Sequence, residues 1–376
     1  MKKNVIFCPY RICPLGAHVD HQHGKVLGFS INKGIHFFYK KSKKIKLTSR
    51  EFSGKIVFGL KDYITPMKDW GDYMRGSIKI LREKYKLKYG VTGKFEGDFM
   101  PGGLSSSAAV TLSFIKAICS VNSISLTNEE LIDTANRVET EFLGLKIGKL
   151  DQSCEVLGRA NSCLFLDTKD MRYMNIPENP DIRGTYKLLV IYSGAPRNLI
   201  DSDYNTRVDE CKSAAYLTLA FNNLKYGKYK DTYLRDVNES YFLEVSEKLP
   251  AKWRKRAMHF YEENKRVDEG VEAWNAGDLV KFGELINKSC ESSIFLYEAG
   301  SELLVELNNI IKNLPGVYGT RFMGGGFNGS VLAVVNSQSL DVVIEGLYDD
   351  FVSAHPELRK DFKIEICEIV DGIGAK

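Results

Sequence analysis

One stretch of the chain reads Pro101-Gly102-Gly103-Leu104-Ser105-Ser106-Ser107-Ala108-Ala109, and it lies between a strand pattern and a helix pattern. Before it, residues 91–99 alternate with a period of two, and after it apolar residues recur every four from Val110 to Ile118. A small-residue loop that opens a helix directs unpaired N–H groups outward, with the positive end of the helix dipole behind them. We therefore predict a phosphate-binding loop over Gly102–Ala108. A plain turn with one serine N-cap is the alternative.

The composition is that of an ordinary globular protein with room for two domains. The 376 residues are 44% hydrophobic and 27% charged, and 52 basic against 48 acidic residues give a net charge of +4, which offers no argument for nucleic-acid binding. The eight cysteines form no C-x-x-C pair, and neither a signal peptide nor a membrane-length apolar run is present. We expect a cytoplasmic protein with no membrane partner. The oligomeric state is open, and a monomer is compatible with the sequence.

The hydrophobic patterns predict an α+β protein. We expect a helix over 128–143, begun by a capping box of Thr127 and Glu130 and closed by Gly144. Strands are expected at residues 4–8, 34–39, 162–167, 187–193, 316–322, 330–335 and 363–369, and further helices at 203–224, 255–275, 278–288, 301–313 and 340–353. The mainly helical region from about residue 203 suggests two domains, 1–195 and 196–376.

Three other patterns suggest sites that their context does not support. Gly324-Gly325-Gly326-Phe327-Asn328-Gly329 fits the dinucleotide fingerprint, but a strand pattern follows it where a helix is needed. Gly144–Lys149 is one residue short of a P-loop, and Leu150 replaces its Ser/Thr. His18, His21 and His23 with Asp20 lack a further ligand at metal-binding spacing.

Six segments, in order along nearly the whole chain, together resemble the GHMP kinase superfamily in its galactokinase branch. Pro9–His21 is similar to the sugar signature of that branch, Gly102–Ala109 to its phosphate loop and Met323–Ser330 to its third, glycine-rich motif. The remaining matches are Trp70–Gly76, Gly148–Gln152 and Tyr204–Cys211.

The resemblance implies a two-domain fold, with an N-terminal ribosomal-S5-domain-2-like domain, a C-terminal ferredoxin-like domain and the active site in the cleft between them. It also implies ATP, Mg²⁺ and phosphoryl transfer to the anomeric hydroxyl of a sugar. Asp151 would be the catalytic carboxylate and Arg11 its cationic partner. The implied sugar contacts are Ala17, His18, Asp20, Gly148 and Tyr204; the implied magnesium ligands are Ser107 and Glu139, and Gly324, Gly325 and Gly326 form the third motif.

These residue types suit the chemistry. Phosphoryl transfer needs in-line positioning and charge stabilisation more than covalent help. Asp151 can accept or orient the hydroxyl proton, while Arg11 balances developing negative charge. Taken singly, Asp151 is also compatible with a helix-start carboxylate, and Glu139 with a surface ion-pair partner.

One departure from the resemblance concerns the substrate. Galactokinases have a glutamate at the position of Ala17, understood to bind the sugar 6-hydroxyl, and alanine cannot accept that bond. A glutamate at this position would repel a substrate carboxylate at C6 by about 1–4 kcal/mol. Alanine at this position does not. Pro9–His21 and Ile31–Ile35 are similar to the galacturonokinase members of the branch. We therefore expect a galacturonate kinase, with Lys33 or Arg207 as candidate cations; a galactokinase and a non-catalytic sugar sensor are the alternatives.

Overall fold

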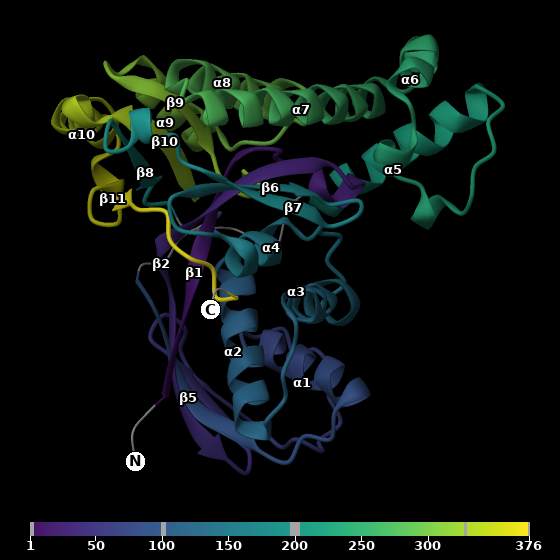
Figure 1. Cartoon of the computed structure of the whole chain (residues 1–376), viewed down its shortest axis with the longest axis vertical. Helices are drawn as coiled ribbons and strands as arrows, with labels where there is room; N and C mark the ends of the chain where they lie inside the picture. The colour runs from purple at the N-terminus through teal and green to yellow at the C-terminus, as the bar shows by residue number, and fades with distance from the viewer. Residues whose placement is uncertain (1–3, 99–102, 196–203, 327–328, 375–376) are drawn as a thin grey trace.

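A seven-stranded sheet forms the first half of the computed structural model, which describes residues 4–98, 103–195, 204–326 and 329–374 (Figure 1). Its strands run in the order β4-β3-β5-β2-β6-β7, with β1 paired to β2, and β3–β5 is a parallel pair. Strand β2 has 18 residues and is longer than each of its neighbours, so it pairs with β1, β5 and β6 along different parts of its length. The bounds are β1 Asn4–Leu15, β2 Lys25–Ser42, β3 Ile45–Ser49, β4 Lys55–Phe58, β5 Gly90–Gly97, β6 Ser162–Asp167 and β7 Arg172–Pro177.

Helix α2 (Ser106–Asn122) is the central helix of this half. It packs on β1, β2 and β5, and Figure 1 shows α1 (Asp72–Lys84) and α3 (Asn128–Arg137) on its other side. Its apolar side chains are almost all fully buried, so neighbours on both sides hold it in place. The short α4 (Leu150–Leu157) packs against α2 and α3 and against β1 and β2.

A second, antiparallel sheet has the order β11-β8-β10-β9. The run 187–193 is predicted to lie in the first domain, but β8 (Tyr186–Tyr192) pairs with the C-terminal strands β10 and β11, so the two sheets divide before β8. An apolar run does not reveal which sheet it joins. The other strands are β9 Val317–Phe322, β10 Ser330–Asn336 and β11 Lys363–Cys367, and the helices are α5 Tyr204–Phe221, α6 Glu239–Val245, α7 Ala251–Ala276, α8 Leu279–Phe295, α9 Glu302–Asn313 and α10 Leu340–Gly346.

The 26-residue helix α7 joins the two halves. It packs against α8 and α5, and also against β1, β2 and β7 of the first sheet (Figure 1). A Cβ on Gly270 would lie 2.3 Å from Leu15 Cδ1, so any larger residue there would force the Leu15 side chain at the end of β1 to shift. α7 can therefore position the loop that follows β1.

Several local expectations are confirmed. Thr127 and Glu130 form the capping box, β6 has the predicted bounds, and the glycine-rich segment is followed by strand β10. The helix expected over 128–143 ends as α3 at Arg137 and continues as a π-helical turn, Val138–Phe142. None of the helices in the described ranges has the length and apolar character needed to cross a bilayer.

Candidate functional site

A buried arginine connects three of the predicted site segments. Arg11 on β1 is 5% exposed, and its Nε donates to Asp151 Oδ1 at 2.7 Å, with Nη2 also 2.7 Å from that oxygen. Its Nη1 donates to Gly103 O at 2.7 Å, and its backbone N–H donates to Leu104 O at 3.4 Å. Arg11 thus fixes the carboxylate of Asp151 relative to the phosphate loop.

The phosphate loop turns into α2 through left-handed backbone. Gly103 has φ +88°, and Ser105, the N-cap of α2, has φ +65°, a strained value for a residue with a side chain. Ala109 N donates to Ser105 O at 3.2 Å, which places the amides of Ser106 to Ala108 in the free first turn. This geometry is suited to an anion at the start of α2. Gly102 lies outside the described residues.

The glycine-rich segment packs against the phosphate loop. A Cβ on Gly103 would lie 2.6 Å from Met323 O, and a Cβ on Gly324 would lie 2.7 Å from Gly103 Cα. The two backbones can touch only because both residues are glycines. Gly326 O accepts from Ser301 N at 2.7 Å, and this bond holds the three glycines 324–326 against the residue that precedes α9.

Asp20 approaches the start of α4 from the loop between β1 and β2, residues 16–24, here called the β1–β2 loop. Leu150 N donates to Asp20 Oδ2 at 3.3 Å, and a Cβ on Gly148 would lie 2.5 Å from the same oxygen. Burial, and next the nearby Asp151, raise the pKa of Asp20 to about 6. Two carboxylates therefore face one small region, where the Leu150 N–H and the guanidinium of Arg11 favour the charged form of Asp20 against burial and the charge of Asp151.

Tyr204, the first residue of α5, lies at the same place. Burial, followed by the charges of Asp20 and Asp151, raises the pKa of its hydroxyl well above the usual range. Its ring meets His21 edge-on at 5.9 Å. The phenol is therefore a neutral hydrogen-bonding group beside the two carboxylates.

His18 is buried with an unused polar atom. Its Nε2 has no hydrogen-bond partner among the described residues, and its ring stacks on Tyr297 with centroids 4.3 Å apart. Burial, and next His259, lower the pKa of His18 well below the usual range, so the ring is neutral. A buried polar nitrogen without a partner costs about 1–3 kcal/mol, which a ligand oxygen at this position would recover.

Glu139 is buried, at 3% exposure, in the π-helical turn. Gln152, which follows Asp151, donates from Nε2 to Glu139 Oε1 at 3.1 Å. Glu139 therefore lies next to α4 in the interior, and the alternative of a surface ion-pair partner does not fit its burial. Ser107 lies in the first turn of α2, which packs against α3 and α4.

Four groups at this site were missed from the sequence: Glu155, His259, Glu263 and Tyr297. Glu155 follows Asp151 by four residues on α4, a helical spacing that could have revealed it; burial, and next Asp151, raise its pKa well above the usual range. His259 and Glu263 lie on α7 and Tyr297 follows α8, and no sequence motif includes these three residues. Glu263 accepts from Gly16 N at 2.8 Å, and His259 Nε2 lies 2.9 Å from Ala17 O.

The two candidate cations are placed differently. Lys33 Nζ pairs with Glu365 of β11 at 2.6 Å. Arg207 lies one helical turn after Tyr204 on α5, with its Nη1 3.5 Å from Glu210 and its Nη2 donating to Glu298 O at 3.3 Å. Arg207 is therefore the candidate that shares an element with the predicted sugar contacts.

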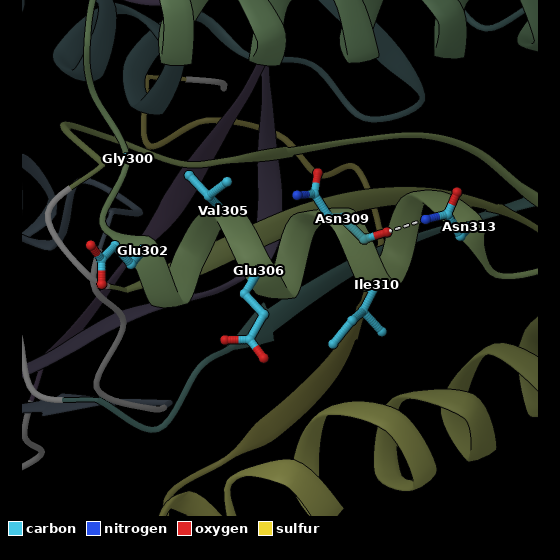
Figure 2. Close-up of a pocket in the computed structure, with 7 residues that line it drawn as sticks. All are labelled: Gly300, Glu302, Val305, Glu306, Asn309, Ile310 and Asn313. Carbon is cyan, nitrogen blue, oxygen red and sulfur yellow. Dashed lines mark hydrogen bonds between the residues drawn. The ribbon is translucent and has the colours of Figure 1, made fainter.

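A surface hollow of about 570 Å³ lies elsewhere, along α9 (Figure 2). It is lined by Gly300, Glu302, Val305, Glu306, Asn309, Ile310 and Asn313, none of which is a predicted site residue. We place the candidate active site around Arg11 and not in this hollow, because buried acidic, basic and polar side chains converge there beside a helix N-terminus.

The arrangement suits transfer of an anionic group to a hydroxyl. The start of α2 offers amides to phosphate oxygens, and Arg11 holds Asp151 next to that position. Asp20, His18 and Tyr204 supply acceptors and donors for a polyhydroxylated molecule beside Asp151.

Comparison with known proteins adds independent support. The family model described as GHMP kinases N terminal domain matches residues 72–159. A galacturonokinase of Arabidopsis thaliana is 34% identical, over 98% of this chain and 92% of that protein. A galactokinase of Lactobacillus helveticus is 32% identical, over 98% of this chain and 94% of that protein.

Solved structures agree. The galactokinase of Lactococcus lactis, crystallised with galactose, matches with a TM-score of 0.88 and 25% identity over 99% of this chain and 94% of that chain. A mevalonate kinase matches with a TM-score of 0.66 and 18% identity over 98% and 99% of the two chains, a likeness of fold.

The contact of Gly148 with Asp20 can be tested by stability alone. Gly148→Ala places a methyl group against Asp20 and is expected to cost about 1–3 kcal/mol of unfolding free energy in urea denaturation. Gly227→Ala, where no atom lies within 4 Å, is the matched control and should change it by less than about 1 kcal/mol. Equal effects of the two substitutions would contradict the close approach.

Proposed function

The chain belongs to the GHMP kinase family, in its galactokinase branch, and we propose that its substrate is galacturonate, converted to galacturonate 1-phosphate. The coarser activity is that of a sugar 1-kinase that uses ATP. The choice of galacturonate depends on Ala17, which stands where galactokinases have a glutamate. The 34% identity to a galacturonokinase supports the same choice.

A substrate carboxylate at C6 fits the environment of Ala17. The side chain of Ala17 carries no charge, so this side chain does not repel an anion as a glutamate would. The unpartnered Nε2 of the neutral His18 can carry the proton and donate to a carboxylate or hydroxyl oxygen. Arg207, one turn from Tyr204, is the proposed cation for the carboxylate.

The remaining roles follow from the positions of the acids. We assign Asp151 to the anomeric hydroxyl, whose proton it orients or accepts, and Arg11 to balancing the charge that develops there. Asp20 accepts hydrogen bonds from sugar hydroxyls, and Tyr204 lies beside it. Gly148 leaves the space that the sugar and Asp20 share.

The nucleotide is proposed to lie with its phosphates on the amides of the phosphate loop. Hydroxyl and carboxylate oxygens are the ligands that Mg²⁺ prefers, and it commonly takes only one or two from protein beside those from phosphates. Within the described ranges, no cluster of three or more acidic, histidine or cysteine side chains offers a full metal cage. Ser107 and the buried Glu139 fit this limited role. When bound, Mg²⁺ would neutralise charge on the transferred phosphate.

Galactose is the second candidate, because the galactokinases of Lactobacillus helveticus and Lactococcus lactis resemble the chain over nearly its whole length. In that case a water molecule would take the place of the missing glutamate side chain. A sugar sensor without turnover is the third candidate, although Arg11, Glu139 and Asp151 are all present.

The substrate is tested by ADP release with galacturonate, galactose, glucuronate and arabinose assayed side by side. We expect galacturonate to give the highest kcat/KM. A higher kcat/KM for galactose would contradict the proposed substrate and favour the second candidate. Sugar binding without any turnover would favour the sensor.

Asp151→Asn keeps the size of the side chain but removes its charge. We expect the turnover to fall by about 10²–10⁴-fold, with nucleotide binding measured by calorimetry nearly unchanged. Asp133→Asn is the control, because the Asp133 side chain is 51% exposed and pairs with Lys149 at the surface, at 3.2 Å. A turnover of Asp151→Asn close to that of the control would remove Asp151 from its role.

Ala17→Glu tests the charge argument. We expect the kcat/KM for galacturonate to fall about tenfold or more relative to that for galactose, because two negative charges would lie a few ångströms apart. Ala17→Gln has the same size without the charge and separates steric from electrostatic effects. The charge argument is wrong if the two variants change the ratio of kcat/KM values equally.

A further inference from the structure

The β1–β2 loop is strained and needs support from outside itself. His18 and His23 have φ of +59° and +62°, values that residues with side chains rarely adopt. Gly16 has φ +88°, and a Cβ there would lie 2.5 Å from Val26 Cα. A conformation of this kind persists only where the surroundings fix it.

Side chains of α7 supply that support at both ends of the loop. Glu263 Oε1 accepts from Gly16 N at 2.8 Å and from Ala17 N at 3.3 Å. At the other end, Asn264 Oδ1 accepts from Lys25 N at 2.8 Å. These bonds join a helix of the second half of the chain to the loop that carries Ala17, His18 and Asp20.

His259 completes the hold on Ala17. Its Nε2 lies 2.9 Å from Ala17 O and its Nδ1 lies 2.8 Å from Ser292 Oγ. Since a carbonyl only accepts, Nε2 carries the proton, and Nδ1 accepts from the serine. Burial lowers the pKa of His259 to about 4, in agreement with this neutral ring.

Glu263 is itself held by a buried network. Arg266 Nε donates to its Oε2 at 2.7 Å, and Ser289 Oγ donates to its Oε1. Arg321 of β9 donates to the same serine, and its Nη1 lies 3.9 Å from Glu263. Burial alone would raise the pKa of Glu263, but the charges of Arg266 and Arg321 and the hydrogen bond from Ser289 lower it to about 2. Glu263 is therefore a charged acceptor, and hydrogen bonds to charged groups are the stronger kind.

We propose that Glu263 and His259 of α7 are positioning residues that set the orientation of the β1–β2 loop and thereby the affinity for the sugar. The inference rests on the proposed function only for the identity of the ligand. Both main-chain groups of Ala17 are occupied by α7, so the loop meets the sugar with its side chains, and their direction depends on this helix.

Glu263→Gln tests the proposal, with Glu262→Gln as the matched control. Glu262 is the neighbouring residue, its side chain is 44% exposed, and it pairs with Arg266 at 3.3 Å. With the best sugar of the panel, Glu263→Gln should raise the sugar KM about tenfold or more, while kcat and the KM for ATP change by less than about threefold. Glu262→Gln should leave all three within about twofold. An unchanged sugar KM in folded Glu263→Gln enzyme would overturn the proposal.

His259 gives a second test that does not depend on a buried charge. His259→Leu should raise the sugar KM, and His259→Gln, whose amide can donate to Ala17 O, should restore part of the loss. A residue that only stabilised the fold would lower the melting temperature in both variants and leave the sugar KM of the folded enzyme unchanged.

Hydrogen exchange separates failure of this proposal from failure of the proposed function. Peptides covering residues 16–24 should exchange at least about tenfold faster in Glu263→Gln than in the parent or Glu262→Gln, with α2 unchanged. This readout stands if no sugar of the panel is phosphorylated. Equal exchange in all three proteins would contradict the hold of α7 on the loop, whatever the substrate.

Discussion

The geometry of the site depends on the buried contacts of Arg11. Its guanidinium joins β1 to the start of α4 through Asp151 and to the phosphate loop through Gly103 O. A guanidinium presents several donors in a rigid fork, so one side chain can fix a carboxylate and a carbonyl together. Asp151, the carboxylate proposed to orient the hydroxyl, and the amides proposed to hold phosphate are thus joined through Arg11.

The second half of the chain supports the β1–β2 loop and the phosphate loop, the proposed sites for sugar and phosphate, in two separate ways. The glycine-rich segment packs backbone to backbone on Gly103, while α7 holds the β1–β2 loop through Glu263, His259 and Asn264. Arg321 lies between these supports, because it bonds Ser289 beside Glu263 and precedes Met323 by two residues on the chain. Arg321 therefore connects the support of the β1–β2 loop to the support of the phosphate loop.

The family, the start of a helix after the serine-rich turn and the pairing of Asp151 with Arg11 could be predicted from the sequence, because motifs place their residues within short segments. The capping box at Thr127 and the bounds of β6 were also predictable, since they depend on neighbours a few residues away. The assignment of β8 to the second sheet was not, because an apolar run does not specify its partner strands. Glu263, His259 and Tyr297 were missed because they reach the site only through the packing of α7 and α8, more than 240 residues from Ala17 in the cases of His259 and Glu263. Gly102 lies outside the described residues, and the catalytic and sugar-binding roles remain proposals.

A crystal structure with a non-hydrolysable ATP analogue and galacturonate tests the central claim most directly. The account predicts nucleotide phosphates on the first amides of α2 and an Asp151 oxygen within about 2.6–3.2 Å of the anomeric oxygen, with Arg11 still bridging Asp151 and Gly103. A nucleotide bound away from α2, or an Asp151 carboxylate turned from the anomeric oxygen while the sugar is bound, would contradict it.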